Sequence, residues 1–592
     1  MILISLLALA SPPKHVKAQL TIHVDDNNIL GPWDGSQQHP YRNVTSALAH
    51  ATTGDTINVH NGTYYENLLI NKTVSIIGEN RNATVIDGKG AGIVVGILAD
   101  GVVLRSCTVR NSGTWDLGIV VGKVSNVMIE ENMINNTGGV FLSLSNRSTV
   151  NENIISHNWC GIRLLMSDGN NLTSNVIENN HQGITLCDVS NTIIRNNTLK
   201  ANVYNLDISG EHLSHYMNSI DSTNTINGKN VCCIINQEDV IVNSSTFPSI
   251  GYLGIVNSTR IKIENVNLTE NKQGILLAFT SNSTIEEALL ARNWMGIELV
   301  SSQHNRIEGC RIENSTYGLS ITGSYNNITS NEIAYNSDGI YIASDGSTLY
   351  RNRIHDNGYR GIYLIGSNNS IYENSIVDNA IGLVIDFYGN KIYHNNFINN
   401  SKQAELNDQR ALGIWDDGYS SGGNYWSDYN GTDLGRTRDG LGDTAYNIAA
   451  NNTDRCPLMG TFSDFSVASA LHVQTICDSA ITNFRFNGSA IIFNVSGQNG
   501  TEGFCRICIP TLLMNGLLKV FVNGTEVSHL AYLPYSNSTH NYLYFAYNHS
   551  EQEVVIVHEF WSSAISIVLM AVAALPIILG RKGPQRRLLV KR

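Results

Sequence analysis

Apolar and polar positions along the chain repeat about every 22 residues. A glycine followed by an apolar residue recurs in two series, and the later series advances by 22, 22, 21, 22 and 21 residues. The later glycines are Gly274, Gly296, Gly318, Gly339, Gly361 and Gly382, and the earlier ones are Gly139, Gly161 and Gly183. An asparagine precedes most of the later glycines by three or four residues, at Asn271, Asn293, Asn314, Asn336, Asn357 and Asn379. A period of this length indicates a stack of repeated structural units.

The residues after each glycine alternate as they do in a β-strand. The first and third positions are Ile or Leu, as in Ile340 and Ile342, and are predicted to point inward. The position between them varies, as in Tyr341 and Tyr363, and is predicted to point outward. The segments between turns are short and rich in β-branched residues, which argues against a helical repeat.

One repeat is too short to bury a core of its own, so successive copies must stack. The sequence therefore predicts an all-β fold with a parallel β-helix of about 22 residues per coil over residues 65–400. The asparagines would form a ladder of stacked turn side chains and would tolerate left-handed backbone at the bends.

Three segments depart from the period. Residues 19–64, which begin a short amphipathic helical pattern at Val44, are predicted to form an N-terminal cap. An insertion interrupts the repeats at about residues 205–250, and residues 401–460 are predicted to form a C-terminal cap with an Asp/Gly loop.

Residues 461–558 have alternating strand patterns and Asn-Gly turns but no 22-residue period. These features predict a small β-sandwich, which would serve as a stalk domain.

Both ends of the chain carry targeting signals. Residues 1–18 contain an apolar run and a cleavage site for a signal peptidase, and they are predicted to be a signal peptide. Residues 561–579 are apolar and long enough to span a bilayer, and the basic residues 580–592 that follow are expected in the cytoplasm. These signals predict a single-pass membrane protein with its N-terminal region outside the cell.

Composition agrees with an exposed location. The net charge of −12 argues against nucleic acid as a partner. Acceptor sites for N-glycosylation are numerous, and the predicted ones are Asn61, Asn71, Asn146, Asn257, Asn282, Asn430 and Asn523. Some of the ten cysteines could pair outside the cell, and Cys505 and Cys508 are close in sequence, but the spacing leaves the connectivity open.

Several longer motifs carry a family resemblance. They are "IHVDDNNILGPWDGSQQHPYRNVTSAL", "GDTINVHNGTYYENLLINKTVSIIGENRNATVIDG", "IDSTNTINGKNV", the "GNYWSDYNGTD" region with "DGLGDTAY" and "PLMG", and "GFCRICIP". With them the chain resembles the right-handed β-helix proteins of the NosD-like, periplasmic copper-binding family, in particular its archaeal cell-surface members. The resemblance implies a right-handed parallel β-helix of the carbohydrate-binding and sugar-hydrolase type. It implies no particular reaction, because fold does not determine function.

The resemblance prompts two metal hypotheses. Family members have a tighter calcium-like loop where this chain has Asp433, Asp439 and Asp443, and an insert with two arginines separates the first two. The alternative, which we favour, is an Asx-turn cap that covers the last coil together with Trp415, Tyr425 and Trp426.

Copper would need soft ligands, and the insertion supplies His212, His215, Met217, Cys232 and Cys233. On a strand, the two histidines would face opposite sides. We therefore favour a structural role for these histidines.

Glycan cleavage would require clustered carboxylates with raised pKa values in a groove. The position just before each repeat glycine is occupied by Gln273, Met295, Tyr317, Asp338, Arg360 and Ile381. The only acid in this column is Asp338, and it stacks beside Arg360. The two are predicted to form an exposed ion pair that contributes little to stability. Residues 260–262 resemble a polygalacturonase signature without its companion motifs. No catalytic residue is predicted.

Tyrosines crowd the later coils, at Tyr317, Tyr325, Tyr335, Tyr341, Tyr350, Tyr359, Tyr363, Tyr372, Tyr388 and Tyr393. Tyr341 and Tyr363 occupy the outward position of adjacent coils, and stacked aromatics can bind sugar rings or a protein partner. The alternative is that tyrosine simply suits exposed strand positions.

The sequence as a whole favours a glycosylated, membrane-anchored protein of the archaeal cell surface. A structural or adhesive role is expected, with envelope polysaccharide or surface-layer proteins as partners. A polysaccharide lyase or hydrolase is the alternative, and copper handling is the second alternative.

Overall fold

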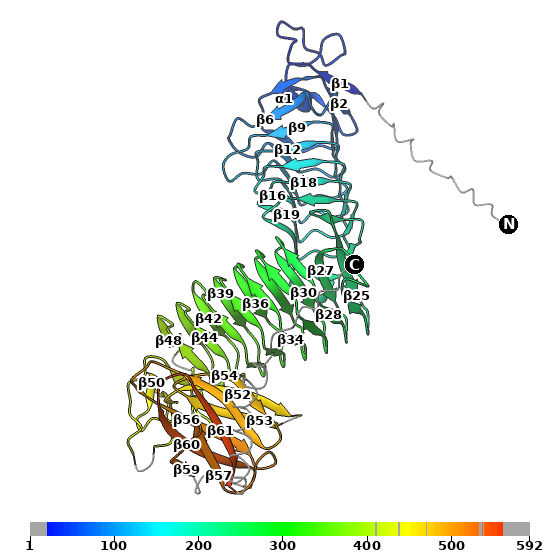
Figure 1. Ribbon diagram of the computed structural model, residues 1–592. Helices are drawn as coiled ribbons and strands as arrows, with labels where there is room; N and C mark the ends of the chain where they lie inside the picture. Colours follow the sequence, from blue (N-terminus) through cyan, green and yellow to red (C-terminus); the bar gives the residue numbers. More distant parts are fainter. Residues whose placement is uncertain are drawn as a thin grey trace, which may run out of the picture. The chain divides into compact units, whose positions relative to one another are not determined.

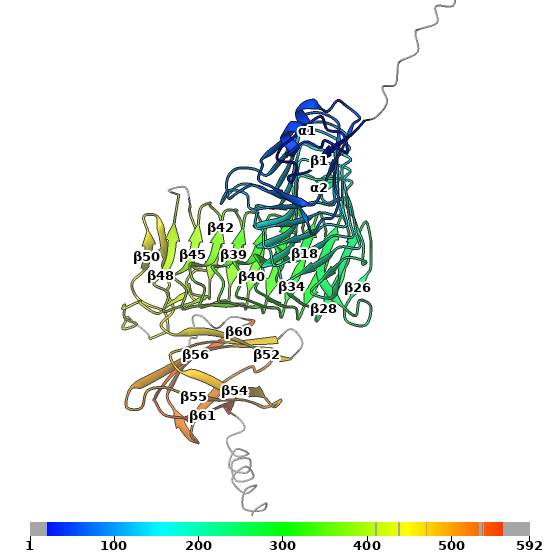
Figure 2. The ribbon, with the colours of Figure 1, turned by 90° about the horizontal axis from the view of Figure 1, so that it is seen from above.

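The protein is an all-β parallel β-solenoid of about 16 turns. The computed structural model describes residues 20–559 except 409–410, 436–437, 469–470, 532–535 and 537. It divides into two compact units, Met1–Ser283 with Ala288–Ser302 and Thr284–Glu287 with Gln303–Arg592. Figures 1 and 2 show the strands of successive coils stacked within each unit. The predicted parallel β-helix is thus confirmed.

In the first unit each early coil contributes one strand to each of three parallel sheets. The first sheet contains β1 (Thr21–Val24), β2 (Thr56–Val59), β5 (Ser75–Gly78), β8 (Val103–Arg105), β11 (Met128–Glu130), β14 (Thr149–Asn151), β17 (Asn171–Thr173), β20 (Ile193–Arg195) and β23 (Ser219–Ile220). The second contains β4 (Leu68–Ile70), β7 (Val95–Ile97), β10 (Ile119–Gly122), β13 (Val140–Ser143), β16 (Cys160–Leu165), β19 (Gln182–Cys187) and β22 (Tyr204–Ser209). The third contains β3 (Gly62–Tyr64), β6 (Thr84–Asp87), β9 (Thr108–Arg110), β12 (Met133–Asn135), β15 (Ile154–Ser156), β18 (Val176–Glu178), β21 (Thr198–Lys200) and β24 (Thr225–Ile226).

The later strands of this unit are β25 (Lys229–Ile235), β26 (Ile241–Val242), β27 (Ile250–Val256), β28 (Lys262–Glu264), β29 (Asn267–Thr269), β30 (Gln273–Ala278), β32 (Leu289–Ala291) and β33 (Met295–Val300). The helix α1 (Val44–His50) buries Val44, Ala47 and Leu48, and the side chain of Asn43 caps its N-terminus. The predicted amphipathic helix is therefore present, and β1 and β2 already pair in parallel within the segment assigned to the cap.

The second unit continues the same pattern in three parallel sheets. One contains β31 (Thr284–Glu286), β34 (Arg306–Glu308), β37 (Asn327–Thr329), β40 (Thr348–Tyr350), β43 (Ser370–Tyr372) and β46 (Lys391–Tyr393). Another contains β35 (Arg311–Glu313), β38 (Glu332–Ala334), β41 (Arg353–His355), β44 (Ser375–Val377), β47 (Asn396–Ile398) and β49 (Tyr425–Trp426). The last contains β36 (Tyr317–Ile321), β39 (Asp338–Ile342), β42 (Arg360–Leu364), β45 (Ile381–Ile385) and β48 (Lys402–Leu406).

The two predicted inward columns form the core. Ile340, Ile342, Ile362 and Leu364 are completely buried, and register pairs Ile340 with Ile362 and Ile342 with Leu364. The outward prediction for the position between them is wrong at Leu276, Ser320 and Val384, which are buried with 0%, 9% and 2% of their surface exposed. Leu276 belongs to a core cluster that includes Tyr216 of the insertion, so the inserted segment contributes to covering this strand.

Buried asparagines form hydrogen-bonded ladders along the turns. The backbone N–H and the Nδ2 of Asn331 both donate to Oδ1 of Asn352 at 3.0 Å, and Asn352 bonds in the same way to Asn374. Asn352 Nδ2 also donates to the carbonyl of Ile328 at 2.8 Å. The ladder therefore satisfies backbone groups that the turns would otherwise bury without partners.

The left-handed backbone at these bends belongs mainly to the residue before the ladder asparagine. Arg351 and Glu373 have φ values of 57° and 58°. Asn314 of the predicted column is itself left-handed, and Ser315 takes the ladder position by donating its N–H to Oδ1 of Asn336. The predicted ladder is therefore present. The left-handed backbone was assigned to the ladder asparagine, but it belongs to the residue before it. The ladder requires an amide side chain, whereas the bend does not.

The repeat glycines are explained by crowding between coils. A Cβ atom on Gly361 would lie 2.6 Å from the carbonyl oxygen of Gly382 and 3.1 Å from Nδ2 of Asn379. Gly318 and Gly339 would meet the next coil in the same way. Glycine is required because the next backbone and the ladder fill the space of a side chain.

The insertion interrupts the stacking. It contains α2 (Leu213–Tyr216), and β25 pairs antiparallel with β24 before it pairs in parallel with β27. The N–H of Asn205 donates to the carbonyl of Glu270 at 2.9 Å, and the N–H of Lys272 donates to the carbonyl of Leu206 at 3.2 Å. These bonds place β22 beside the start of β30, which follows it by more than 60 residues in the chain.

An aromatic stack ends the second unit's solenoid. Trp426 lies between Phe397 and Tyr446, and the ring centroids are 4.4 Å apart on each side. Its indole N–H donates to Asp454 at 2.9 Å, and that of Trp415 donates to Asn452 at 2.9 Å. The strands β50 (Tyr446–Ala449) and β51 (Asn452–Asp454) form a hairpin here.

Two five-stranded antiparallel sheets follow. One contains β52 (Thr461–Ala468), β53 (Leu471–Cys477), β56 (Glu502–Pro510), β60 (His540–Asn548) and β59 (His529–Ala531). The other contains β54 (Ala480–Phe486), β55 (Ala490–Ser496), β61 (Gln552–His558), β57 (Leu518–Val522) and β58 (Thr525–Val527). Both sheets supply residues to one apolar cluster, for example Ile507 and Ile556.

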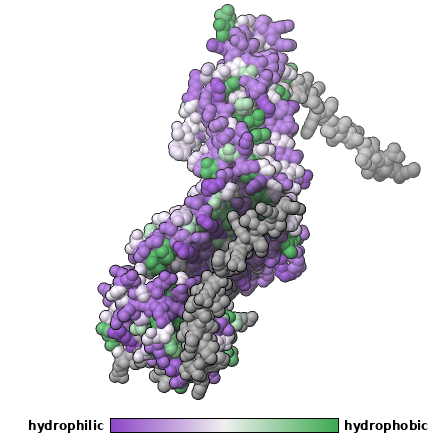
Figure 3. All heavy atoms as spheres, viewed as in Figure 1, coloured by the Kyte–Doolittle hydropathy of each residue, from purple (hydrophilic) through white to green (hydrophobic). Residues whose placement is uncertain are grey.

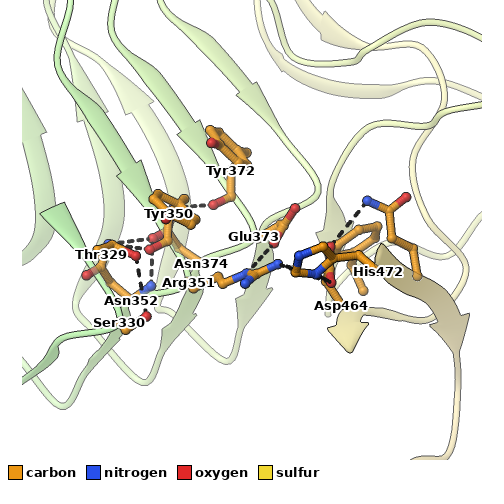
Figure 4. A network of polar contacts seen from close by, with 12 residues as sticks. Thr329, Ser330, Tyr350, Arg351, Asn352, Tyr372, Glu373, Asn374, Asp464 and His472 are labelled. Atoms are coloured by element: carbon orange, nitrogen blue, oxygen red, sulfur yellow. Dashed lines mark hydrogen bonds and ion pairs between the residues drawn. The ribbon is translucent and has the colours of Figure 1, made fainter. Parts of the chain in front are cut away.

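Polar contacts join these sheets to the solenoid of the same unit. Arg351 lies between Glu373, at 2.8 Å, and Asp464, at 3.1 Å, and His472 contacts Asp464 at 2.7 Å (Figure 4). Arg351 and Glu373 belong to turns of adjacent coils, whereas Asp464 and His472 belong to β52 and β53. Arg351 therefore forms charge-assisted bonds with one carboxylate of the solenoid and one of the antiparallel sheets.

No helix among the described residues is long and apolar enough to cross a membrane. The predicted signal peptide (1–18), membrane span (561–579) and basic tail (580–592) lie outside the described residues. On the face drawn in Figure 3, the surface is mostly hydrophilic and its apolar residues form small, separate areas.

Candidate functional site

The predicted tyrosine pair lies on the outward side of β39 and β42. Tyr341 and Tyr363 are half-buried register partners with ring centroids 5.7 Å apart, but their planes meet at 64°. The Tyr363 hydroxyl donates to Asp386 at 2.7 Å, and the guanidinium of Arg360 lies 4.0 Å from the centre of its ring. The pair therefore forms edge-to-face contacts, and one face of Tyr363 is already occupied.

The ion pair between Asp338 and Arg360 is a correction to the sequence analysis. The bond is bidentate, at 2.6 and 2.9 Å, and Asp338 is only 4% exposed. The rings of Tyr359 and Tyr363 lie against the guanidinium. The pair is buried because these rings cover it, so it is a structural contact and not an exposed one.

The three loop aspartates are bonded to their own loop. Asp433 accepts the N–H groups of Asp439 and Gly440, and Asp443 accepts those of Leu434 and Gly435, at 2.8 to 3.2 Å. Asp439 accepts the hydroxyl of Tyr419 at 2.6 Å. Burial raises the pKa of Asp433, and the charges of the other two aspartates raise it further. Calcium binding at this loop stays a prediction.

The residues considered as copper ligands are divided between α2 and β25. His212 and His215 lie at α2, not on the expected strand, so their rings are near each other at 5.2 Å. His215 is paired with Asp188 at 3.1 Å, and burial raises the pKa of the Cys232 thiol to about 11. Among the described residues, no three His, Cys, Asp or Glu side chains are arranged to hold a metal ion. These residues therefore do not fit copper.

The seven predicted acceptor asparagines are all exposed. They are Asn61, Asn71, Asn146, Asn257, Asn282, Asn430 and Asn523. Exposure is required for glycan attachment, and glycosylation itself stays a prediction.

A row of aromatic rings in the first unit was missed by the sequence analysis. We call it the aromatic row, and it consists of Trp115, Trp159, His181, Tyr204 and Trp294. Consecutive ring centroids are 6.3, 4.2, 5.6 and 5.8 Å apart. Trp115 is 85% exposed and Trp159 is 55% exposed, although tryptophan usually buries most of its surface.

A cluster of polar side chains adjoins the end of the aromatic row. We call it the acid–lysine cluster, and it consists of Asp207, Lys272, Gln273 and Glu298. The ammonium of Lys272 lies 3.7 Å from the ring centre of Trp294 and 6.0 Å from that of Tyr204, which links the cluster to the row. Gln273 donates from Nε2 to Asp207 at 3.1 Å and to the carbonyl of Ile208 at 3.3 Å. One Glu298 oxygen is buried without a hydrogen-bond partner.

Burial sets the protonation of this cluster. It raises the pKa of Glu298 to about 7, and the charge of Asp207 adds to the shift. It also raises the pKa of Asp207, against the opposing effect of Lys272, and lowers the pKa of Lys272. Two carboxyls with raised pKa values in one cluster are the kind of arrangement that paired acid and base chemistry requires.

The break in stacking creates this cluster, because β22 lies beside β30 only where the insertion leaves the solenoid. Part of the signal was nonetheless present in the sequence. Trp159, His181, Lys272 and Trp294 all occupy the position two residues before a repeat glycine. The sequence analysis considered the column one residue before the glycine and so missed them.

A histidine contact in the antiparallel sheets resembles catalytic chemistry but lacks its geometry. Nε2 of His549 lies 2.8 Å from the hydroxyl of Ser479 and 3.5 Å from Asp478. In a hydrolase triad the carboxylate contacts the other ring nitrogen. The serine is also buried and accepts the hydroxyl of Tyr547.

The stacked coils, asparagine ladders and glycine columns define a right-handed parallel β-helix protein. Residues 216–386 and 343–431 match a family model described as periplasmic copper-binding protein (NosD), and residues 69–225 match a right-handed β-helix region. Residues 28–100 match a family of unknown function. Residues 216–431 are therefore similar to the NosD family, and residues 69–225 are similar to right-handed β-helix proteins more generally.

The chain also has a weak similarity to several solved structures. A pectin methylesterase in complex with a hexasaccharide is 12% identical, covers 45% of this chain and 80% of its own, and has a TM-score of 0.24. The A-module of a mannuronan C-5 epimerase from Azotobacter vinelandii is 13% identical, with coverage of 62% and 93% and a TM-score of 0.20. Tailspike protein 3 of bacteriophage CBA120 is 12% identical, with coverage of 72% and 65% and a TM-score of 0.26. No curated protein matches the chain.

Proposed function

We propose that this protein binds polysaccharide outside the cell, with the aromatic row as its binding surface. The observation that carries the proposal is the run of neighbouring rings with two strongly exposed tryptophans. Sugar rings have apolar faces that stack on aromatic side chains, and the polar tips of tryptophan and tyrosine can bond to hydroxyl groups.

The acid–lysine cluster supports the same proposal. Binding sites combine apolar surface with a few fixed polar groups that set ligand orientation. Here the ammonium of Lys272 is held over Trp294, and Asp207 is held by Gln273. A glycan that follows the row would therefore meet oriented donors and acceptors at one end.

The test is a glycan array with the full chain, followed by titration of each hit with tryptophan fluorescence as the signal. The variant Trp159→Ala should weaken binding about tenfold, because one stacking surface of the row is lost. The matched control is Trp33→Ala, which removes a tryptophan that is 49% exposed and lies outside the row.

Equal affinity of the Trp159→Ala variant and the unaltered protein would contradict this binding surface. If Tyr363→Ala weakened binding instead, the tyrosine pair of the second unit would be the surface.

A second candidate function is polysaccharide cleavage by a hydrolase or lyase. The specific observation in its favour is the pair Asp207 and Glu298, whose raised pKa values allow one carboxyl to donate a proton while the other accepts one. Positioned acid–base catalysis of this kind contributes rate factors on the order of 10²–10⁴.

Product formation from the bound glycans distinguishes the two functions. If cleavage occurs, Glu298→Gln should lower kcat on the order of 100-fold and leave affinity nearly unchanged. The control Glu178→Gln alters a half-buried acid on β18 outside the cluster and should leave kcat unchanged. Binding without any product would support the adhesive role alone.

The remaining features complete the proposal. The signal peptide, the span at 561–579 and the glycans would place the solenoid at the cell surface, where residues 461–558 would form a β-sandwich stalk. Surface-layer proteins are a further proposed class of partner, and calcium at Asp433, Asp439 and Asp443 would stiffen the cap.

A further inference from the structure

Two cysteines face each other across neighbouring antiparallel strands. Cys477 ends β53, and its register partner on β56 is Cys505. Directly opposed residues in an antiparallel pair share one face of the sheet and have neighbouring Cβ atoms. Both side chains are buried in the apolar cluster between the two sheets, at 1% and 0% exposure.

Each of the two thiols also shifts the pKa of the other. A hydrogen bond with Cys505 lowers the pKa of the Cys477 thiol, whereas burial raises the pKa of Cys505. Cys477 Sγ lies 3.2 Å from the carbonyl oxygen of Phe504 and 3.3 Å from the hydroxyl of Tyr547. These groups hold the sulfur of Cys477 in place beside its partner.

The pair that is close in sequence does not have this arrangement. Cys508 follows Cys505 by three residues, so on a strand their side chains point to opposite faces. The register partner of Cys508 is Gln474. The strand register therefore selects Cys477 over Cys508 as the neighbour of Cys505.

We propose that Cys477 and Cys505 form a disulfide bond in the mature protein. The oxidant is a disulfide, either a small-molecule one such as oxidised glutathione or that of a dithiol oxidase. The Cys477 thiol loses its proton to water, and the resulting thiolate attacks one sulfur of this disulfide. A mixed disulfide forms on Cys477, and the other sulfur leaves as a thiolate that takes up a proton. The Cys505 thiolate then attacks the Cys477 sulfur and releases the second thiol, so two cysteine thiols are oxidised and one disulfide is reduced to two thiols.

The bond would join two neighbouring strands of one sheet and enclose a hairpin of the other. It closes a loop over residues 478–504, which contains β54 and β55 of the other sheet. Closing this loop restricts the unfolded chain, so the hairpin of the second sheet stays tethered to the first. Disulfide bonds persist in oxidising compartments, and residues 19–558 are predicted to lie in one.

The test is peptide mapping of the full chain after export, or after treatment with oxidised glutathione. The protein is denatured without reductant, alkylated, digested and analysed by mass spectrometry. We expect a peptide pair joined through Cys477 and Cys505, and at most eight of the ten thiols titrating in denaturant. Recovery of both cysteines as alkylated thiols from folded, oxidised protein would overturn the proposal, and so would linkage of either one to another cysteine.

A stability measurement on variants provides the second readout. Dithiothreitol should lower the denaturation midpoint of the unaltered protein and of the control Cys310→Ala, whose buried thiol donates to the carbonyl of Glu308. It should not shift the midpoint of Cys505→Ala. A shift of the same size in Cys505→Ala would refute the bond, whatever the outcome of the glycan experiments.

Discussion

Burial determines the charge state of several individual side chains in this protein. It lowers the pKa of His394 to about 4 and raises that of Asp454 to about 6. His394 stacks on Phe462 with centroids 4.3 Å apart and donates from Nε2 to the carbonyl of Ser421 at 3.2 Å. Its neutral form is favoured because the surrounding protein replaces water that would solvate the cation.

His394 makes stability depend on pH on the acid side of neutrality. The folded pKa lies below the value of 6.5 for a free histidine, so the unfolded chain binds more protons between those two values. Stability is therefore lost as the pH falls from about 6.5 to 4, by about 3 kcal/mol if this group acts alone. Urea denaturation at a series of pH values measures the slope.

The variant His394→Phe keeps a ring for stacking and removes the titration, so the slope in this interval should become smaller. The matched control is His157→Phe, because His157 also has a left-handed backbone but is exposed. An unchanged slope in His394→Phe would show that another group controls the acid response.

For individual residues, the sequence predicted which side chains are neighbours better than it predicted their burial and their pKa values. It identified Asp338 and Arg360 as neighbours, but the rings that bury them belong to Tyr359 and Tyr363, whose rotamers no spacing specifies. The same limit applies to Glu298. Its position in the outward column is readable. Its raised pKa comes mainly from burial and in smaller part from the charge of Asp207, which lies on a strand 91 residues earlier in the chain.

At the scale of elements, each coil is held by the ladder and by close contact at the glycine. We expect Gly361→Ala to destabilise the protein by about 1–3 kcal/mol, because its Cβ would overlap the carbonyl oxygen of Gly382. Gly358→Ala in the same coil should change stability by less than about 1 kcal/mol, since the nearest atom to its Cβ is 3.8 Å away. Thermal unfolding of both variants measures the difference, and equal losses would refute the steric explanation.

The coil was predictable because its constraints are local and repeated. Every repeat needs two inward apolar residues, one glycine and one ladder side chain, so the pattern survives variation at the other positions. The short helix α2 was not predictable in this way. Its four residues have no period, and His212 and His215 were therefore expected on a strand.

At the scale of the whole molecule, the proposed location outside the cell depends on segments that flank the described residues. We expect the full chain to sediment with membranes and to resist extraction with carbonate, because residues 561–579 are apolar enough to span a bilayer. A chain that ends at residue 559 should be released in soluble form. Membrane fractionation and immunoblotting measure both.

A chain that lacks only residues 580–592 is the control, and it should stay in the membrane with a less strictly fixed orientation. Recovery of the full chain in the soluble fraction would refute the anchor.

The acid–lysine cluster could not be predicted from the repeats, because it depends on a contact between strands that are far apart in the sequence. The acid–lysine cluster joins residues on either side of the insertion, and the contact between β22 and β30 follows from how the inserted segment folds. No repeat in the sequence encodes that contact. The loss of the period at about residue 205 was the available clue to an unusual region.

The asparagine ladder has a consequence for how such a chain can change its length. Each rung bonds to the rungs before and after it and to a backbone carbonyl of the preceding coil, and successive rungs are separated by 21 or 22 residues. Duplication or loss of one whole coil would present the next rung with the same partners, whereas a shift of a few residues would leave amides facing apolar side chains. The gene can therefore lengthen or shorten the protein in steps of one coil, and a binding surface on the coils would grow or shrink in the same steps.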